Sequence, residues 1–232
     1  MLSDSGTCEI DIAGNLATYL GDRKPTARYA SFDYCFNHFQ QHRAELGSLA
    51  LLEMSCLHLG FYLASWGMYR GSPDLLQRSL KHLEPLIDAI ASADPRVWAI
   101  DANGYTDGSI EVILHTARVL RLALGRASDT LVTKIMLGVF GCVPAFDVNV
   151  KAALGVTTFG KKALTKVRDF YSENAEIIEA NRVLTLELAT GAETSLRYTR
   201  AKVIDMVFFI EGMKGRIPTQ DPQAPAGASP LS

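Results

Sequence analysis

Lys134 and Asp147 are isolated charged residues in an otherwise apolar run, residues 129–150, that also contains a glycine turn. The run predicts a helix, a break at two glycines, and a second helix beginning at Pro144, because proline suits the first turn of a helix. Main-chain N–H groups at such a turn and at the start of the second helix can bind phosphate, which the helix dipole favours. The residues expected to contact a nucleic-acid backbone are Lys134, Gly138, Gly141 and Lys151.

This hairpin resembles the helix-hairpin-helix unit of DNA glycosylases, in which a similar hairpin is followed by a catalytic aspartate. The resemblance implies that Asp147 is the catalytic candidate and that residues 200–212 form the closing helix. The hairpin departs from that pattern because its glycines are spaced Gly-x-x-Gly rather than Gly-x-Gly, and because Lys134 precedes them instead of following. If the turn is only structural, Lys134 extends to the surface and Asp147 caps or pairs locally.

Three longer segments resemble a widespread family of uncharacterised bacterial proteins. They are RYASFDYCFNHF (28–39), LHLGFYLASWGMYRGS (57–72) and TLVTKIMLGVFGCVPAFD (130–147). The resemblance implies an all-helical intracellular domain, and no activity follows from it.

A second group of residues predicts a small-molecule pocket. Trp66 and Arg70 end a long apolar helix beside a turn, and a guanidinium is a planar two-point donor for carboxylate or phosphate. Asp33 is the acid on a helix with an aromatic stripe, where it could pair with Arg28 or Arg70. The residues expected to line this pocket are Asp33, Trp66, Arg70 and Tyr105. The alternative is that Arg70 only satisfies the last carbonyls of its helix.

Two histidines at helical spacing, His38 and His42, are followed by Glu45 and could share one face of a helix. Imidazole and carboxylate groups bind divalent metals such as Zn²⁺. The alternative is a solvated polar face, and no HExxH sequence strengthens the metal interpretation. We therefore predict no metal site and keep these three residues as the candidates for one.

Composition excludes several functional classes. Hydrophobic residues make up 48% of the 232 residues and charged residues 21%, which suits a buried core rather than disorder. The net charge of −2 gives no global attraction to nucleic acid or membrane. Four cysteines without a CxxC pair indicate a reducing, cytoplasmic compartment. No cofactor is expected, because the chain has no P-loop and no dinucleotide-binding fingerprint.

Apolar residues recur with a period near 3.6, which predicts an all-α protein of about eight or nine helices. Residues 1–217 are expected to form one compact helical domain, with a two-lobed body as the alternative, and residues 218–232 a disordered Pro/Ala-rich tail. Leu49–Tyr69 is predicted to be the central buried helix rather than a membrane span. Its small residues would form a ridge against which another helix packs. This ridge consists of Cys56, Gly60 and Ala64.

Three functional classes remain open at this stage. The first is a nucleic-acid-interacting protein that uses the hairpin. The second is a small-molecule enzyme or ligand-binding domain with its pocket near Trp66 and Arg70. The third is a non-catalytic protein-interaction module, whose partner is another protein or a second copy of the chain. No membrane partner is expected.

Overall fold

The computed structural model describes residues 10–70 and 73–215. Within these residues the all-helical prediction is confirmed, and the sheet consists of two short strands. The predicted start of the first helix at Cys8 and the predicted tail at 218–232 lie outside the described residues.

The helices begin and end largely where capping residues and glycines predict. Ser128 accepts a hydrogen bond from the N–H of Leu131 at the start of α7, and Gly125 follows the last residue of α6. The first half of the chain forms α1 Ile12–Gly21, α2 Ser31–Gln41, α3 Leu49–Ser65, α4 Pro73–Leu76, α5 Glu84–Ala91 and α6 Asp107–Leu124. The second half forms α7 Asp129–Phe140, α8 Val148–Leu154, α9 Lys161–Glu173, α10 Ala175–Ala180, β1 Leu184–Leu186, β2 Glu193–Arg197 and α11 Arg200–Lys214. Short 3-10 turns connect several of these elements, including Leu80–Leu83 between α4 and α5.

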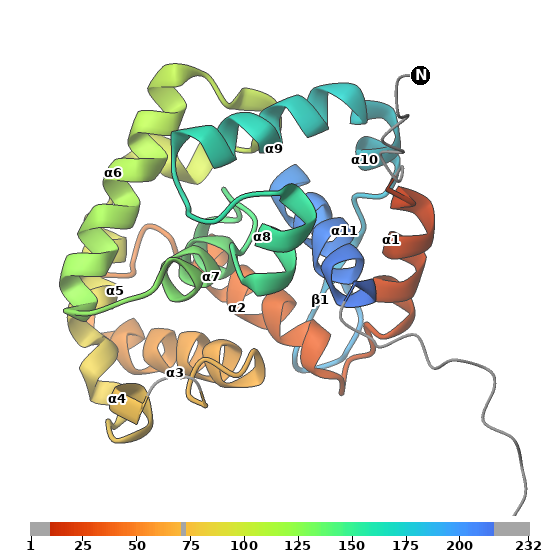
Figure 1. Cartoon of the computed structure of the whole chain (residues 1–232). Helices are drawn as coiled ribbons and strands as arrows, with labels where there is room; N and C mark the ends of the chain where they lie inside the picture. The colour runs from red at the N-terminus through yellow and green to blue at the C-terminus, as the bar shows by residue number, and fades with distance from the viewer. Residues whose placement is uncertain (1–9, 71–72, 216–232) are drawn as a thin grey trace, which may run out of the picture.

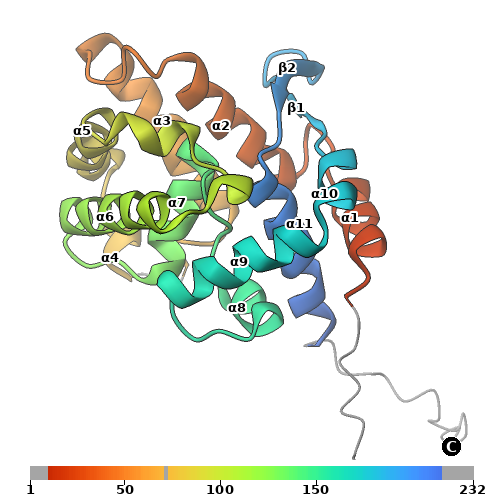
Figure 2. The same ribbon diagram turned by 90° about the horizontal axis from the view of Figure 1, so that it is seen from above.

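The centre of the molecule is formed by α7 and α11 (Figures 1 and 2). The side chains of α7 are buried from Leu131 to Phe140, and those of α11 from Ala201 to Ile210. α11 packs against α8 and α1, while α7 packs against α2. These contacts join most of the buried apolar residues into one connected core.

The prediction that Leu49–Tyr69 forms the central helix is wrong. α3 ends at Ser65 and lies at the edge of the molecule (Figure 1), with one side against α2 and the other side exposed. The small-residue ridge is also wrong as a helix contact, because Ala64 is exposed and Gly60 faces Leu80 in a 3-10 turn. The apolar character of α3 is distributed all round, so periodicity alone did not show which side faces inward.

After α9 and α10 the chain enters the first strand, β1. β1 pairs antiparallel with β2, with Leu184 opposite Arg197 and Leu186 opposite Glu193. The β1–β2 hairpin is attached to α2 by Asn37, whose side-chain amide donates to the carbonyl of Leu186. Among the described helices, none combines the length and apolar character needed to cross a membrane.

Candidate functional site

The glycine turn between α7 and α8 is buried, which does not favour its use as a phosphate-binding surface. A Cβ on Gly138 would lie 2.5 Å from the ring of Tyr62, and one on Gly141 would lie 2.7 Å from Thr199. Gly141 adopts a left-handed conformation (φ 67°) and ends α7. Both glycines are therefore required for close packing and for the helix end.

The segment after the turn also differs from the predicted helix start. Pro144 lies in an extended loop, and α8 begins at Val148 with Asp147 as its N-cap. The loop N–H groups of Ala145 and Phe146 donate to Asp205 and Thr133, so neither is available to a ligand. Lys151, the last of the predicted backbone contacts, is half-buried on α8.

Lys134 and Asp147 do meet, and they form a buried ion pair. The Lys134 ammonium lies 3.2 Å from the Asp147 carboxylate, and the two residues are 4% and 8% exposed. Asp147 uses its other oxygen to accept from the N–H groups of Asn149 and Val150, which caps α8. Capping and local pairing were expected of Asp147 in a structural turn. Extension of Lys134 to the surface was not found, because its ammonium lies 4.8 Å from the centre of the Trp66 ring.

This ion pair lines a pocket of about 550 Å³ between the end of α3 and helices α7, α8 and α11, the last three of which lie together in Figure 1. The wall combines three formal charges with apolar surface. The lining residues are Arg28, Trp66, Met68, Thr130, Lys134, Asp147, Val148, Asn149, Phe209 and Met213. The volume is within the range of small-molecule sites.

Two buried polar atoms of the pocket residues have no hydrogen-bond partner among the described residues. They are the indole Nε1 of Trp66, a donor, and the side-chain Oδ1 of Asn149, an acceptor. An unpaired buried polar group costs on the order of 1–3 kcal/mol, so such groups are rare unless something else binds them. Both atoms are inaccessible to solvent, and Asn15, Tyr69 and His82 have atoms of the same kind elsewhere in the described residues, so these atoms do not by themselves mark the pocket.

The charges of the pocket leave a formal surplus of one positive charge. Arg28 and Lys134 are cationic and Asp147 is anionic. The Arg28 guanidinium is exposed and lies 5.3 Å from the centre of the Trp66 ring. No described residue forms an ion pair with Arg28. Its guanidinium is thus available at the mouth of the pocket.

The predicted pocket of four residues is not assembled, because only Trp66 among them lines this one. Arg70 is exposed and lies outside the lining. The hydroxyl of Tyr105 donates to the carbonyl of Cys142 in the core. Asp33 does not pair with Arg28 or Arg70; it pairs with Arg23, whose Nη2 lies 2.8 Å away.

The metal candidates do not form a ligand set. His38 is buried and shares a 2.9 Å hydrogen bond with Ser55, while its ring stacks on His58 at 4.3 Å between ring centres. The prediction of a solvated polar face is therefore wrong for His38. Glu45 is exposed, and nowhere in 10–70 or 73–215 do three His, Cys, Asp or Glu side chains gather in a way that could hold a metal ion.

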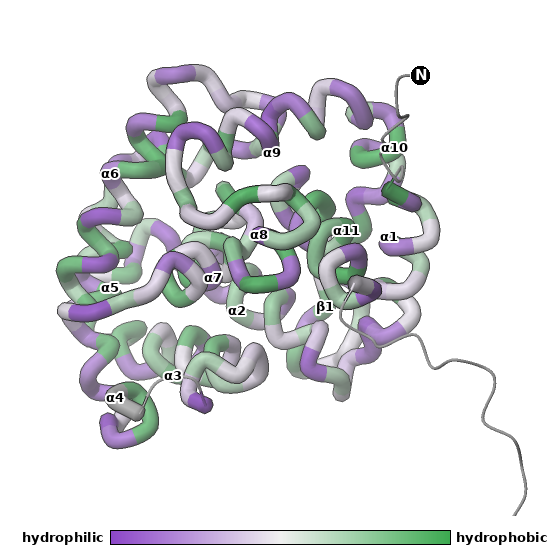
Figure 3. Tube along the Cα trace, viewed as in Figure 1, coloured by the Kyte–Doolittle hydropathy of each residue, from purple (hydrophilic) through white to green (hydrophobic). Residues whose placement is uncertain are grey.

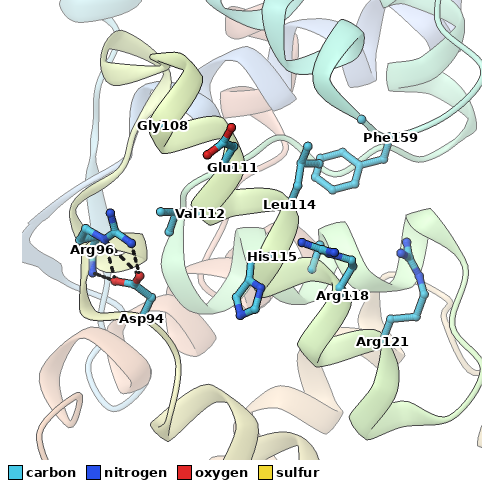
Figure 4. Close-up of a pocket in the computed structure, with 12 residues that line it drawn as sticks. Asp94, Arg96, Gly108, Glu111, Val112, Leu114, His115, Arg118, Arg121 and Phe159 are labelled. Carbon is cyan, nitrogen blue, oxygen red and sulfur yellow. Dashed lines mark hydrogen bonds and ion pairs between the residues drawn. The ribbon is translucent and has the colours of Figure 1, made fainter.

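A larger hollow of about 880 Å³ follows the outer side of α6, and Figure 4 shows its polar lining. Two of its arginines are already paired: Arg96 with Asp94, and Arg121 with Asp129. Its lining includes Glu111 as well as His115 and Arg118, all on one helix face. The ion pairs of this hollow are more exposed to solvent than the Lys134–Asp147 pair, which makes the hollow a weaker candidate than the pocket at Lys134.

Sequence reasoning missed Arg28, Asn149 and Met213 as pocket residues. Arg28 lies in a 3-10 turn before α2, more than a hundred residues from Lys134 in the chain, so no local pattern connects them. Asn149 follows Asp147 at the start of α8, and its proximity to a predicted site residue was the available signal.

No protein-family model, curated protein or solved structure matches this chain. The argument for function therefore rests on the geometry of this pocket.

Proposed function

We propose that the pocket at Lys134 and Asp147 binds a small organic anion. The observation that carries this proposal is the buried ion pair of Lys134 and Asp147, which lines a pocket of about 550 Å³ together with the cationic Arg28. The surplus positive charge selects an anion over a cation.

The recognition chemistry follows from the lining. Arg28 offers a planar pair of N–H donors at the mouth, which suits a carboxylate or a phosphate group. The Lys134 ammonium is a donor and the Asp147 carboxylate an acceptor in the lining, so the ligand carries both an acceptor and a donor. Met68, Phe209 and Met213 give the pocket apolar walls for a hydrocarbon or ring portion.

A second candidate function is the binding of a nucleic acid through this pocket. Lys134 and Asp147 were predicted as nucleic-acid and catalytic residues, and both line the pocket, while the glycine turn is buried. A nucleic acid would therefore use the pocket for a single nucleotide unit rather than the turn for its backbone. A mononucleotide combines an anionic phosphate with a ring that has donors and acceptors, so both candidates share one ligand chemistry.

Calorimetric titration of the full chain distinguishes them. We would use inorganic phosphate, benzoate, four nucleoside monophosphates and a short single-stranded oligonucleotide, each over a salt series. Saturable binding of a mononucleotide or benzoate supports the pocket, and binding of the oligonucleotide alone with a steep loss at higher salt supports a polymer site. No binding of any of these probes overturns the proposal.

Two variants and one matched control test the location. Lys134→Met and Arg28→Ala are each expected to weaken binding at least tenfold, because each removes a cation of the pocket. Arg96→Ala removes an arginine from the hollow on α6 and is expected to leave binding unchanged. Equal loss in all three variants would indicate nonspecific charge attraction.

We also propose a cytoplasmic location. Cys35, Cys56 and Cys142 are free and buried, and free thiols persist in reducing compartments.

A further inference from the structure

The outer face of α3 has a row of exposed apolar side chains with the spacing of a coiled-coil seam. The exposed positions are Ala50, Met54, Leu57, Phe61 and Ala64, which alternate spacings of four and three residues. Met54, Leu57 and Phe61 are 46%, 42% and 63% exposed. Alternation of four and three is the 3.5-residue repeat with which one helix packs against another.

This row is separate from the face that α3 uses in its own fold. Cys56, Leu59, Tyr62 and Leu63 are buried and contact the core. The exposure of this row places it on the solvent side of α3, and α3 itself lies at the lower edge of the molecule in Figures 1 and 3. We name it the α3 seam, defined by the five exposed positions above. A helix that required only its own core would have polar residues at these positions.

We propose that the α3 seam pairs with the same seam of a second copy of this chain. A seam with a 3.5-residue repeat requires a helix with the same repeat, and α3 itself supplies that helix. Exposed large apolar residues elsewhere in the described chain occur singly on their elements, such as Leu122 on α6, Val148 on α8 and Leu188 after β1. A two-fold pair buries one patch against its own copy, which is the commonest symmetry of soluble oligomers.

The near absence of charged residues on α3 also favours pairing with a second copy of this chain. Glu53 is the one acidic or basic residue among its 17 residues, apart from His58, which stacks on His38. Two copies therefore face each other without a row of like charges. A foreign charged partner would find little on α3 to match, because charge complementarity requires charged residues beside the seam.

The dimer is expected to be reversible. A 17-residue helix is about 25 Å long, so a helix pair alone covers a small interface. Leu49 at the start of α3 is 88% exposed and adds one apolar side chain beyond the seam. Association should therefore depend on protein concentration in the micromolar range.

Sedimentation equilibrium of the full chain over a concentration series tests the proposal. The wild type is expected to shift from monomer to dimer, and Phe61→Glu to stay monomeric at the same concentrations. Leu122→Glu is the matched control, because Leu122 is 79% exposed on another helix, and it should dimerise like the wild type. Circular dichroism checks that each variant is folded. A wild type that stays monomeric throughout, or a Phe61→Glu variant that still dimerises, overturns the proposal.

Disulfide crosslinking locates the contact independently. Leu57 is the middle position of the seam, so it faces its own copy in either a parallel or an antiparallel pair. Leu57→Cys in a Cys8→Ser background should crosslink under mild oxidation, and Leu122→Cys in the same background should not. Met54→Cys crosslinks efficiently in a parallel pair only, because an antiparallel pair places Met54 opposite Phe61. Crosslinking at position 122 but not at position 57 would contradict the seam.

Discussion

Two buried carboxylates of this protein illustrate different uses of buried charge. Asp33 is fully buried and has three partners: Arg23, the hydroxyl of Tyr198 and the N–H of Leu186. Asp147 is also buried and has Lys134 and two cap N–H groups as partners. Asp33 joins α2 to the strands, whereas Asp147 and its partner Lys134 line a pocket.

The two carboxylates differ in whether a pocket borders the groups that surround them. Around Asp33, Arg23 also donates to the carbonyl of Leu184, so the network fixes the strands and provides no open position. Burial raises the pKa of Asp33, and the neighbouring Arg23 opposes that shift. Around Asp147, the ion pair with Lys134 borders a pocket of about 550 Å³. A charge network with no open position indicates a structural role, and an ion pair that borders a pocket indicates a ligand.

The largest expected loss of stability follows from breaking the network around Asp33. Asp33→Ala leaves Arg23 buried without its carboxylate and should reduce the free energy of unfolding by about 3–5 kcal/mol. Asp169→Ala, which removes an exposed ion pair with Arg168 within α9, should leave the denaturation midpoint unchanged. Chemical denaturation measures both variants. A small effect of Asp33→Ala would show that its network does not hold α2 to the strands.

Packing at α3 gives an effect of intermediate size, at a site distant from both carboxylates. Gly60→Leu should destabilise the fold by about 1–3 kcal/mol, because a side chain at this position meets Leu80. Gly21→Leu is the control, since a Cβ at Gly21 meets nothing within 4 Å. Thermal denaturation compares the two. Full tolerance of Gly60→Leu would contradict the close approach of α3 to the turn at Leu80.

The buried His38 adds a pH dependence of stability of its own. Burial first, and then the neighbouring His58 and His42, lower the pKa of His38 to about 4. Since the unfolded chain binds this proton near pH 6.5, it binds more protons than the folded chain between pH 6.5 and 4. Stability should therefore fall as the pH decreases through this window, by an amount on the order of 2 kcal/mol.

His38→Gln is the variant that assigns this pH effect, because glutamine keeps a hydrogen-bonding group for Ser55 but does not titrate. Denaturation midpoints at pH 7, 6, 5 and 4 should fall less steeply in the variant than in the wild type. Identical slopes would show that another group causes the dependence.

The smallest loss of stability is expected for substitutions in the pocket, although these substitutions should weaken ligand binding strongly. Lys134→Met combined with Asp147→Asn removes both charges of the pair, and asparagine keeps a side-chain oxygen for the two cap hydrogen bonds. We expect a stability change of about 1 kcal/mol or less, because replacing both partners of a buried ion pair by uncharged residues can be nearly neutral. A loss as large as that of Asp33→Ala would show that the Lys134 pair is structural in the same way.

Much of the helical fold could be predicted from local sequence, because capping residues and glycines act within one turn. Ser128 and Gly125 marked helix ends correctly. The strands were missed because they have three and five residues, too few for an alternating pattern. The orientation of α3 was missed because both of its faces are apolar, and sequence does not show which face has a neighbour in the same chain.

The site could be predicted only in part. Lys134 and Asp147 were identifiable because each is a single charge in an apolar run, and burial of such a charge requires a partner. Arg28 and the pairing of Asp33 with Arg23 were not identifiable, because tertiary packing brings them together. The predicted phosphate contacts of Gly138 and Gly141 require that the glycine turn is exposed. The spacing of residues along the chain does not determine whether it is.

The most direct test of the central claim is an NMR titration that follows the two tryptophan indole N–H signals. The chain has two tryptophans, Trp66 in the pocket and Trp98, which packs on Phe140 in the core. Addition of a mononucleotide monophosphate or of benzoate should shift the Trp66 signal in a saturable way, leave Trp98 unchanged, and lose its effect in Lys134→Met. An unchanged Trp66 signal with both probes, or an equal shift of both tryptophans, would contradict the pocket as the ligand site.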